Sequence, residues 1–471
     1  MSDSLHHKII TLPEGKNATD IVGERHDIVF LFDATKANPN GDPDAGNTPR
    51  LQPDSLKGLV TDVCLKRKVR NFFSLYNPDG TLMSDRPHDR YRIFIRENAI
   101  LKDDLDESHQ FISRRFFSEA LDSLKSRSYI TEETATSIGQ EIAFEDFPDK
   151  PKKVKEFVIG CLKGRVSFAP LLKEMLSQLE NFQDVSADVK SGLATFVPAD
   201  EDQKSEEKML KAILDKAKKL AAKGEAKLLE ERLKQCYQKV SPSAQIADRF
   251  AELNLEKATR DYVCWSFFDN RAFGCVISTK GPLEGSFYGQ VRGPIQMSFA
   301  ESLDKILQLD ATITRCAVAS KDEMESSKDA SDAGGNRTMG RKHLVDYGLY
   351  RAHIFFSPAF AAKTGFTYCD LDNFFFALKH LFRDDAAAGR AGMRVVGLVD
   401  FEHASALGNE HAHKLFEKVA VEKRDKRKEF PSSLSDYHGI APEGAVVTAK
   451  ENDQEKMLVT ARKLVWEVAA Q

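Results

Sequence analysis

The sequence predicts an α+β fold, in which a ferredoxin-like sheet is interrupted by a large helical insertion. Two observations predict this fold. Short runs of β-branched and aromatic residues alternate with helical segments in the order β-α-β, then further strands, a helix and a last strand. Between the halves of that pattern, residues 102–257 show helical periodicity instead. A chain of 471 residues is long enough for two or three such folded units.

The first predicted strand is residues 26–34, because the letters HDIVFLFDA form a β-branched and aromatic run. Turn-forming Gly, Asn and Pro follow in residues 35–47. A helix is then expected up to about Phe73, with Asp54 or Ser55 as its N-cap. Basic residues cluster toward the end of this helix, where the helix dipole favours them.

Two further segments complete the first half of the host, which spans residues 26–101. Residues 91–97 alternate polar and apolar side chains, as a half-buried strand does. Residues 1–25 have no clear periodicity and are expected to form a weakly structured lead-in.

The insertion, residues 102–257, is predicted to be a helical subdomain. Its expected helices are 113–126, 153–162, 171–182 and 206–237. Apolar residues recur at helical spacing in the last of these, with lysines and glutamates between them. Such amphipathic helices either pack on each other or bind a partner, and the sequence leaves both possibilities open.

The host resumes at residue 258 and extends to residue 471. Its expected strands and helix, in chain order, are strands 271–279, 289–299, 312–320 and 346–356, helix 370–382 and strand 393–402. Residues 321–337 are polar and rich in Gly and Ser, and we expect a loop there.

The composition excludes several protein classes. Hydrophobic residues make up 41% and charged residues 30%, which is typical of a protein with a buried core. No apolar run is long enough to span a membrane, and no secretory signal is present. The seven cysteines are scattered without a Cys-x-x-Cys pair, so a reduced, cytoplasmic protein without zinc or another cofactor is expected. The phosphate-loop and nucleophile-elbow motifs are absent too.

Local charge points to nucleic acid even though the net charge is −4. The segment from Lys57 to Arg70 also holds Lys66, Arg67 and Lys68, against the single acid Asp62. A second basic segment, residues 334–343, resembles an extended arm that binds phosphates. Local clusters rather than net charge decide phosphate binding. The alternative for the helix end is a solvated face, and the alternative for residues 334–343 is an ordinary mobile loop.

Two motifs invite a metal interpretation, and both are weak. The loop around Asp42 and Asp44 lacks the Gly and Glu that an EF-hand needs, so a turn stabilised by Asx hydrogen bonds is expected. His403, His411 and His413 have no Cys or carboxylate at metal-ligand spacing, and no metal site is predicted.

Seven segments together resemble one family, the backbone subunits of type I-C CRISPR Cascade complexes (the Cas-seven family, Csd-two group). The matching segments are FLFDATKANPNGDPDAGNTPR (30–50), GLVTDVCLKRKVRNF (58–72), FFDNRAFGCVIST (267–279), GQVRGPIQMSFA (289–300), TITR (312–315), TMGRKHLVDYGLYRAH (338–353) and FEHASALGNEHAHKLF (401–416). The insertion departs from the family, which has a much shorter connection there.

The resemblance implies an RNA-recognition-like palm, with a thumb hairpin near residues 321–346. It implies a protein without catalysis that polymerises along the spacer of a CRISPR RNA. Its partners would be the guide, target DNA paired with the guide, further copies of itself, other Cascade subunits and, indirectly, a recruited helicase-nuclease. The expected RNA contacts are Asn38, Asn40, Lys57, Lys66, Arg67, Lys68, Arg70, Arg271, Arg292, Arg337, Met339, Arg341, Lys342 and His343.

Two rival functions remain open at this point. One is an RNA endonuclease of the type III backbone kind, using Asp42 or Asp44. The other is a protein-only scaffold, in which the basic segments have no ligand. Salt-dependent RNA binding separates guide binding from the scaffold, and RNA cleavage would reveal the nuclease.

Overall fold

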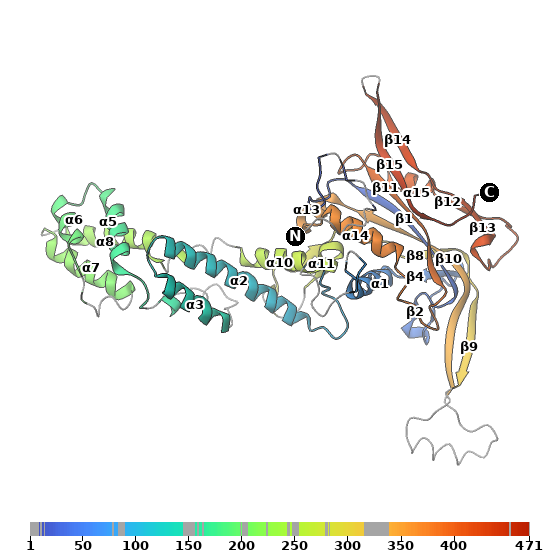
Figure 1. Cartoon of the computed structure of the whole chain (residues 1–471), viewed down its shortest axis with the longest axis horizontal. Coiled ribbons are helices and arrows are strands. Elements are labelled where there is room, and N and C mark those ends of the chain that lie inside the picture. The colour runs from blue at the N-terminus through green and yellow to red at the C-terminus, as the bar shows by residue number, and fades with distance from the viewer. Residues whose placement is uncertain are drawn as a thin grey trace, which may run out of the picture. The chain divides into compact units, whose positions relative to one another are not determined.

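The computed structural model divides the chain into two compact units, whose elements are labelled in Figure 1. The sheet unit comprises residues 1–99, 264–276 and 290–471, and the helical unit comprises residues 100–263 and 277–289. The residues that the structure describes are 9, 12–13, 15–77, 80–82, 90–144, 156–157, 160–162, 164–197, 199, 206–222, 225–242, 245–246, 254–277, 281, 283–314, 339–451 and 454–470.

The sheet unit is built on an antiparallel sheet of nine strands among the described residues. The strand order is β14-β15-β11-β1-β10-β8-β4, and β7 and β9 also pair with β10. The bounds are β1 (His26–Ala37), β4 (Lys57–Val60), β7 (Ile295–Met297), β8 (Ala300–Lys305), β9 (Gln308–Thr314), β10 (Met339–Phe356), β11 (Met393–His403), β14 (Gly444–Glu451) and β15 (Gln454–Trp466). The predicted mixed α+β architecture is confirmed.

Strand β1 lies at the centre because both of its faces are apolar. It pairs with β10 from His26↔Phe356 to Ala37↔Val345 and with β11 on its other side. Side chains alternate between the faces of a strand, and a strand covered on both sides is apolar at successive positions. Phe30 and Leu31 accordingly belong to two different core clusters.

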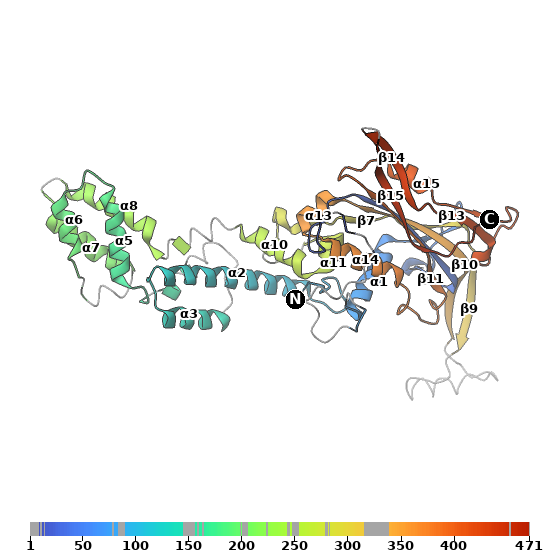
Figure 2. The ribbon, with the colours of Figure 1, turned by 45° about the horizontal axis from the view of Figure 1, so that its top comes forward.

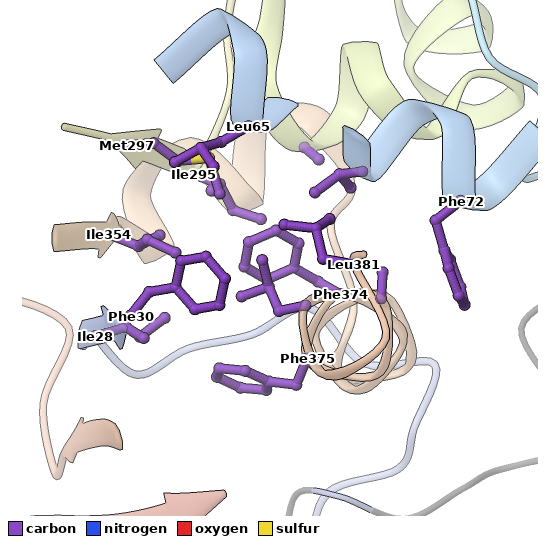
Figure 3. Packing of buried hydrophobic residues seen from close by; sticks show 14 of the residues in the cluster. Ile28, Phe30, Leu65, Phe72, Ile295, Met297, Ile354, Phe374, Phe375 and Leu381 are labelled. Atoms are coloured by element: carbon purple, nitrogen blue, oxygen red, sulfur yellow. The ribbon is translucent and has the colours of Figure 1, made fainter. Parts of the chain in front are cut away.

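Helices cover the first face of the sheet, as Figure 3 shows for the packing between strands and helices. Phe30 and Ile354 from the strands share this cluster with Leu65 and Phe374 from the helices. The helices of this unit are α1 (Asp62–Leu75), α11 (Phe268–Phe273), α13 (Pro358–Thr364) and α14 (Tyr368–Lys379). A capping box between Thr367 and Asp370 begins α14.

The second face is covered by a short helix and a hairpin. Their bounds are α15 (Ala412–Glu417), β12 (Ala420–Lys423), β13 (Tyr437–Ile440) and the 3₁₀ turn η4 (Leu434–Asp436). Phe416 of α15 and Tyr437 of β13 lie in the same cluster as Leu31 of β1. Smaller elements of the unit are β2 (Gly41–Asp42), η1 (Pro43–Ala45), β3 (Thr48–Pro49), β5 (Gly274–Val276) and β6 (Gln290–Arg292).

The helical unit has a core of its own, in which apolar residues from several helices form one buried cluster. The helices are α2 (Leu101–Ser126), α3 (Glu132–Phe144), α5 (Phe168–Glu180), α6 (Ala187–Ala194), α7 (Glu206–Leu220), α8 (Ala226–Val240) and α10 (Leu255–Ser266), with the 3₁₀ turn η3 (Phe287–Gly289). Figures 1 and 2 both show α5, α6, α7 and α8 gathered together. No described helix is long and apolar enough to cross a membrane.

Several predicted boundaries were wrong for identifiable reasons. The first helix begins after Thr61, whose side chain accepts from the Cys64 N–H, rather than at Asp54 or Ser55. The residues before it form β4, which pairs with β8 far along the chain. The predicted helix 206–237 is two helices, α7 and α8. The predicted strand 289–299 is likewise split into β6 and β7.

The predicted strand 91–97 does not form, because its backbone binds a side chain instead of a neighbouring strand. The N–H groups of Phe94 and Ile95 donate to the Asp269 carboxylate at 2.8 and 3.1 Å. A single bridge between Arg92 and Phe267 is the sheet-like pairing that remains in this segment. Sequence alternation cannot reveal a partner that lies so far along the chain.

Other predicted segments differ in extent. Residues 271–273 end helix α11, so the strand expected at 271–279 is reduced to β5. The lead-in is partly docked, since Val22 is buried in the first core cluster. Most of the predicted helix 153–162 lies outside the described residues, as do residues 315–338, which hold most of the expected thumb.

Candidate nucleic-acid interface

An open hollow of about 490 Å³ brings together segments from three distant parts of the sheet unit. It is lined by the turn after β1, the helix α1, the start of β10 and the loop before β11. Seven of the predicted RNA contacts line it: Asn38, Asn40, Arg67, Lys68, Arg341, Lys342 and His343. The family resemblance predicted each of these seven residues as an RNA contact, and the fold brings them together around one hollow.

The turn after β1 is tied to the N-terminus of α1 through Asn40. The Asn40 Oδ1 accepts hydrogen bonds from the Thr61 N–H at 2.9 Å and the Thr61 hydroxyl at 3.0 Å. Asn38 closes the turn by donating from Nδ2 to the Asn47 carbonyl at 2.8 Å. Asn47 has a φ of 65°, in the left-handed region that Asn tolerates. Both asparagines therefore shape one wall of the hollow.

The Asp42 carboxylate is engaged within this turn, and Asp44 contributes its backbone N–H. The Asp42 side chain accepts from the Asp44 N–H at 3.2 Å and caps the 3₁₀ turn η1. Asp42 also lies 3.6 Å from the Arg50 guanidinium. This is the Asx turn that the sequence predicted.

The cations of the hollow differ in how available they are. Arg67 keeps 57% of its side chain exposed while pairing with Glu97. Lys68 is buried, pairs with Asp385 and lies 5.7 Å from the Phe382 ring, so it stabilises the wall of the hollow. Arg390, which the sequence analysis missed, is 47% exposed and lies 3.3 Å from Asp385.

The hairpin of β9 and the first half of β10, here called the arm, forms the other side of the hollow. Arg341 pairs with Thr312 across the arm, and Lys342 pairs with Ala311. His343 contacts the Asp310 carboxylate through Nδ1. The side chains of β9 are mostly exposed, so the arm offers both faces to a ligand. Met339 begins β10 opposite Thr314, and Arg337 lies outside the described residues.

Four predicted contacts near the protein surface do not line the hollow, and each has a partner of its own. Lys57 is 3.3 Å from Glu301, and Lys66 is 2.8 Å from Asp62. Arg70 donates to Asp269 at 2.9 Å, and the Arg292 guanidinium lies 4.5 Å from the centre of the Phe360 ring. Lys66 and Arg70 are one helical turn apart, and neither lines the hollow with Arg67.

Arg271 is fully buried, and its guanidinium is satisfied from several sides. Its Nε and Nη2 donate to the two carboxylate oxygens of Asp370 at 3.0 and 2.9 Å. Its remaining hydrogen bonds go to the carbonyls of Cys264, Trp265 and Arg90. The structure therefore gives Arg271 a role in the core, and Arg271 does not line the hollow.

His403 is engaged by the protein through both ring nitrogens. Its Nε2 lies 2.9 Å from Asp27, and its Nδ1 accepts from the Asn409 N–H at 2.8 Å. Within the part of the chain that the structure describes, no group of three or more His, Cys, Asp or Glu residues is arranged to hold a metal ion.

Comparison with known proteins gives the family. The family model for CRISPR-associated protein Cas7 matches residues 24–156 and 198–441, which is most of the chain. A CRISPR-associated protein Cas7 from Haloferax volcanii is 47% identical over 47 residues, or 10% of this chain. That match spans only 14% of the relative's length.

A solved chain of a CRISPR RNA-guided surveillance complex in its pre-nicking state also aligns with this protein. The alignment covers 80% of this chain and 78% of that chain, with 12% identity and a TM-score of 0.32. The family assignment rests on the extent of the family-model match. The chain belongs to the family of the CRISPR-associated protein Cas7.

Proposed function

We propose that the chain is a CRISPR RNA-binding backbone subunit of a type I-C Cascade-like surveillance complex. It would polymerise along the guide spacer in the cytoplasm and present the guide for pairing with target DNA. The observation that carries the proposal is the hollow between α1 and the arm, which joins Asn38, Arg67 and Arg341 from distant parts of the sequence. Cations beside amide groups suit a phosphate backbone, because such contacts fix register without reading bases.

The strand order supports an RNA-recognition-like palm. Taken in chain order, β1, α1, β8, β10, α14 and β11 form a β-α-β-β-α-β unit whose spatial order is β11-β1-β10-β8. The arm would serve as the thumb, because β9 and β10 continue beyond this unit as a two-stranded hairpin. The guide's own base pairing would then read the target sequence.

We propose a role without catalysis, with DNA cutting left to a recruited helicase-nuclease. The engagement of Asp42 in its own turn and with Arg50 favours a structural role over the RNA endonuclease alternative. Contacts with further copies and with other Cascade subunits belong to the same proposal. A repeated head-to-tail contact would produce a filament along the guide.

The test is RNA binding over a range of salt concentrations. The purified chain should bind CRISPR RNA at low salt, and the affinity should fall as salt rises, because counterions are released. Arg67→Ala should lower the slope of log affinity against log salt by roughly 0.7, the value for one single-stranded phosphate. Lys66→Ala is the matched control on the same helix, and its slope should stay unchanged. A folded chain that binds no CRISPR RNA at low salt would refute the proposal.

A further inference from the structure

A strongly basic loop lies on the other face of the sheet unit from α1. Five of the six residues from 423 to 428 are cations, in the sequence KRDKRK. The loop follows β12, and the β12–β13 hairpin packs in the second core cluster, whereas α1 packs in the first. No residue of this loop lines the hollow between α1 and the arm.

Three of its five cations hold the loop in place. Lys423 lies 3.0 Å from Asp304, and Lys428 lies 2.7 Å from Asp436. Arg424 donates to the carbonyls of Tyr437 and Ala470, each at 3.0 Å. The backbone is fixed as well, because the Arg427 N–H donates to the Asp425 carboxylate at 2.9 Å. The loop is therefore preorganised.

The other two cations, Lys426 and Arg427, are exposed and form no ion pair with any residue that the structure describes. The described residues of the loop include no exposed large apolar side chain. Interfaces between proteins usually have an apolar or aromatic centre, whereas contacts to a phosphate backbone need only charge and hydrogen bonds. A nucleic-acid backbone fits this loop better than a protein partner does.

The loop lies next to the base of the arm. Lys423 contacts Asp304 of β8, and Glu429 lies 2.6 Å from Lys305, the last residue of β8. The next strand, β9, belongs to the arm, so the loop is anchored beside the base of the arm. Lys426 and Arg427 therefore lie in a loop whose two ends are anchored at β8, the strand that precedes the arm.

We infer that Lys426 and Arg427 form a second binding site for a phosphodiester backbone, next to the base of the arm. The inference rests on the proposed function and extends it to a second face of the sheet unit. The phosphates have two possible sources, the guide and the target strand paired with it.

The test variant is Lys426→Ala with Arg427→Ala, compared with Lys450→Ala with Lys456→Ala. The control pair removes two exposed lysines from the β14–β15 hairpin of the same unit. One assay titrates CRISPR RNA onto the chain, and a second titrates complementary single-stranded DNA onto the guide-loaded chain. The test variant should lower the salt slope by about 1.4 in one of the two assays, for two phosphates at roughly 0.7 each. The assay that changes identifies the strand.

A second variant, Lys426→Arg with Arg427→Lys, keeps both charges and should restore the slope. Unchanged slopes in both assays, with wild-type RNA binding intact, would overturn the inference and leave the proposed function standing. Loss of a bound protein subunit, with both slopes unchanged, would overturn it in favour of an acidic protein partner. An absence of RNA binding by the wild type would instead refute the proposed function itself.

Discussion

At the scale of single residues, Arg271 shows why charge alone does not identify a ligand contact. The sequence places this arginine in a segment that resembles an RNA-binding family, yet the fold buries it against Asp370. Arg390 shows the converse, because it lines the hollow although nothing in the surrounding letters DDAAAGR marks it. Whether a cation faces solvent depends on contacts between residues far apart in the chain.

Asp370 should make the sheet unit sensitive to acid. Burial alone would raise the pKa of its carboxyl, but Arg271 and Arg90 outweigh burial and hold that pKa well below the usual value of 3.8. Because the pKa of Asp370 is lower in the folded than in the unfolded state, its ionised carboxylate stabilises the fold at pH values above the unfolded-state pKa. This stabilisation is lost as the pH falls below the unfolded-state pKa toward the folded-state pKa. Asp370→Asn should lower the free energy of unfolding by about 3–5 kcal/mol at pH 7, since it breaks a buried ion pair.

Chemical denaturation between pH 7 and pH 3 measures this effect. The difference in free energy of unfolding between wild type and Asp370→Asn should become smaller as the pH falls through the range in which the Asp370 carboxyl of the unfolded chain is protonated. Asp44→Asn, at an exposed turn position, is the control for the loss of one negative charge. A gap that stays constant with pH would show that the destabilisation comes from packing rather than from the ion pair.

At the scale of elements, strands with two buried faces were the easiest to predict. The residues of β1 and β11 are apolar at successive positions, so both strands can be recognised from the sequence without knowing which strands pair with them. The segment 91–97 shows the limit, since its backbone donors bind Asp269 instead of another strand. The β14–β15 hairpin was not predicted either, because charged and polar residues interrupt its apolar positions and weaken the strand pattern.

The arm is the element whose cations should affect RNA binding most directly. Arg341→Ala with Lys342→Ala should lower the salt slope for CRISPR RNA by about 1.4, because two phosphate contacts are lost. The thermal midpoint should change little, since the arm contributes no buried side chain to the core at these positions. Salt titration and a melting curve on the same sample measure both quantities. A large drop in melting temperature would mean that the two cations support the fold instead.

At the scale of the whole molecule, two units with separate cores are combined in one chain. The sequence revealed the helical insertion through its change of periodicity, without indicating that residues 277–289 also belong to that unit. That segment returns to the helical unit after β5, and local periodicity carries no information about such a return.

Deleting residues 103–256 and joining the ends with a short Gly/Ser bridge tests the role of the helical unit. Guide binding should survive, because the hollow, the arm and the basic loop all belong to the sheet unit. Binding of target DNA to the guide-loaded chain is the second measurement. Intact DNA binding would indicate that the insertion only enlarges the protein, whereas reduced DNA binding would indicate that it contacts the target.

Loss of guide binding by a deletion variant that still melts cooperatively would contradict this expectation. It would place part of the RNA site in the helical unit. The isolated sheet unit should be checked for a single unfolding transition before either assay is interpreted.

The central position of β1 has a consequence for synthesis on the ribosome. Its partners β10 and β11 are made about 300 residues later, which at roughly 5–20 residues per second means a delay of about 15–60 s. During that interval β1 has no strand to pair with, whereas most of the helical unit, which lies between β1 and β10 in the sequence, has already been synthesised. The nascent chain therefore carries an exposed, aggregation-prone strand, and chaperone capacity is expected to limit the yield of this protein.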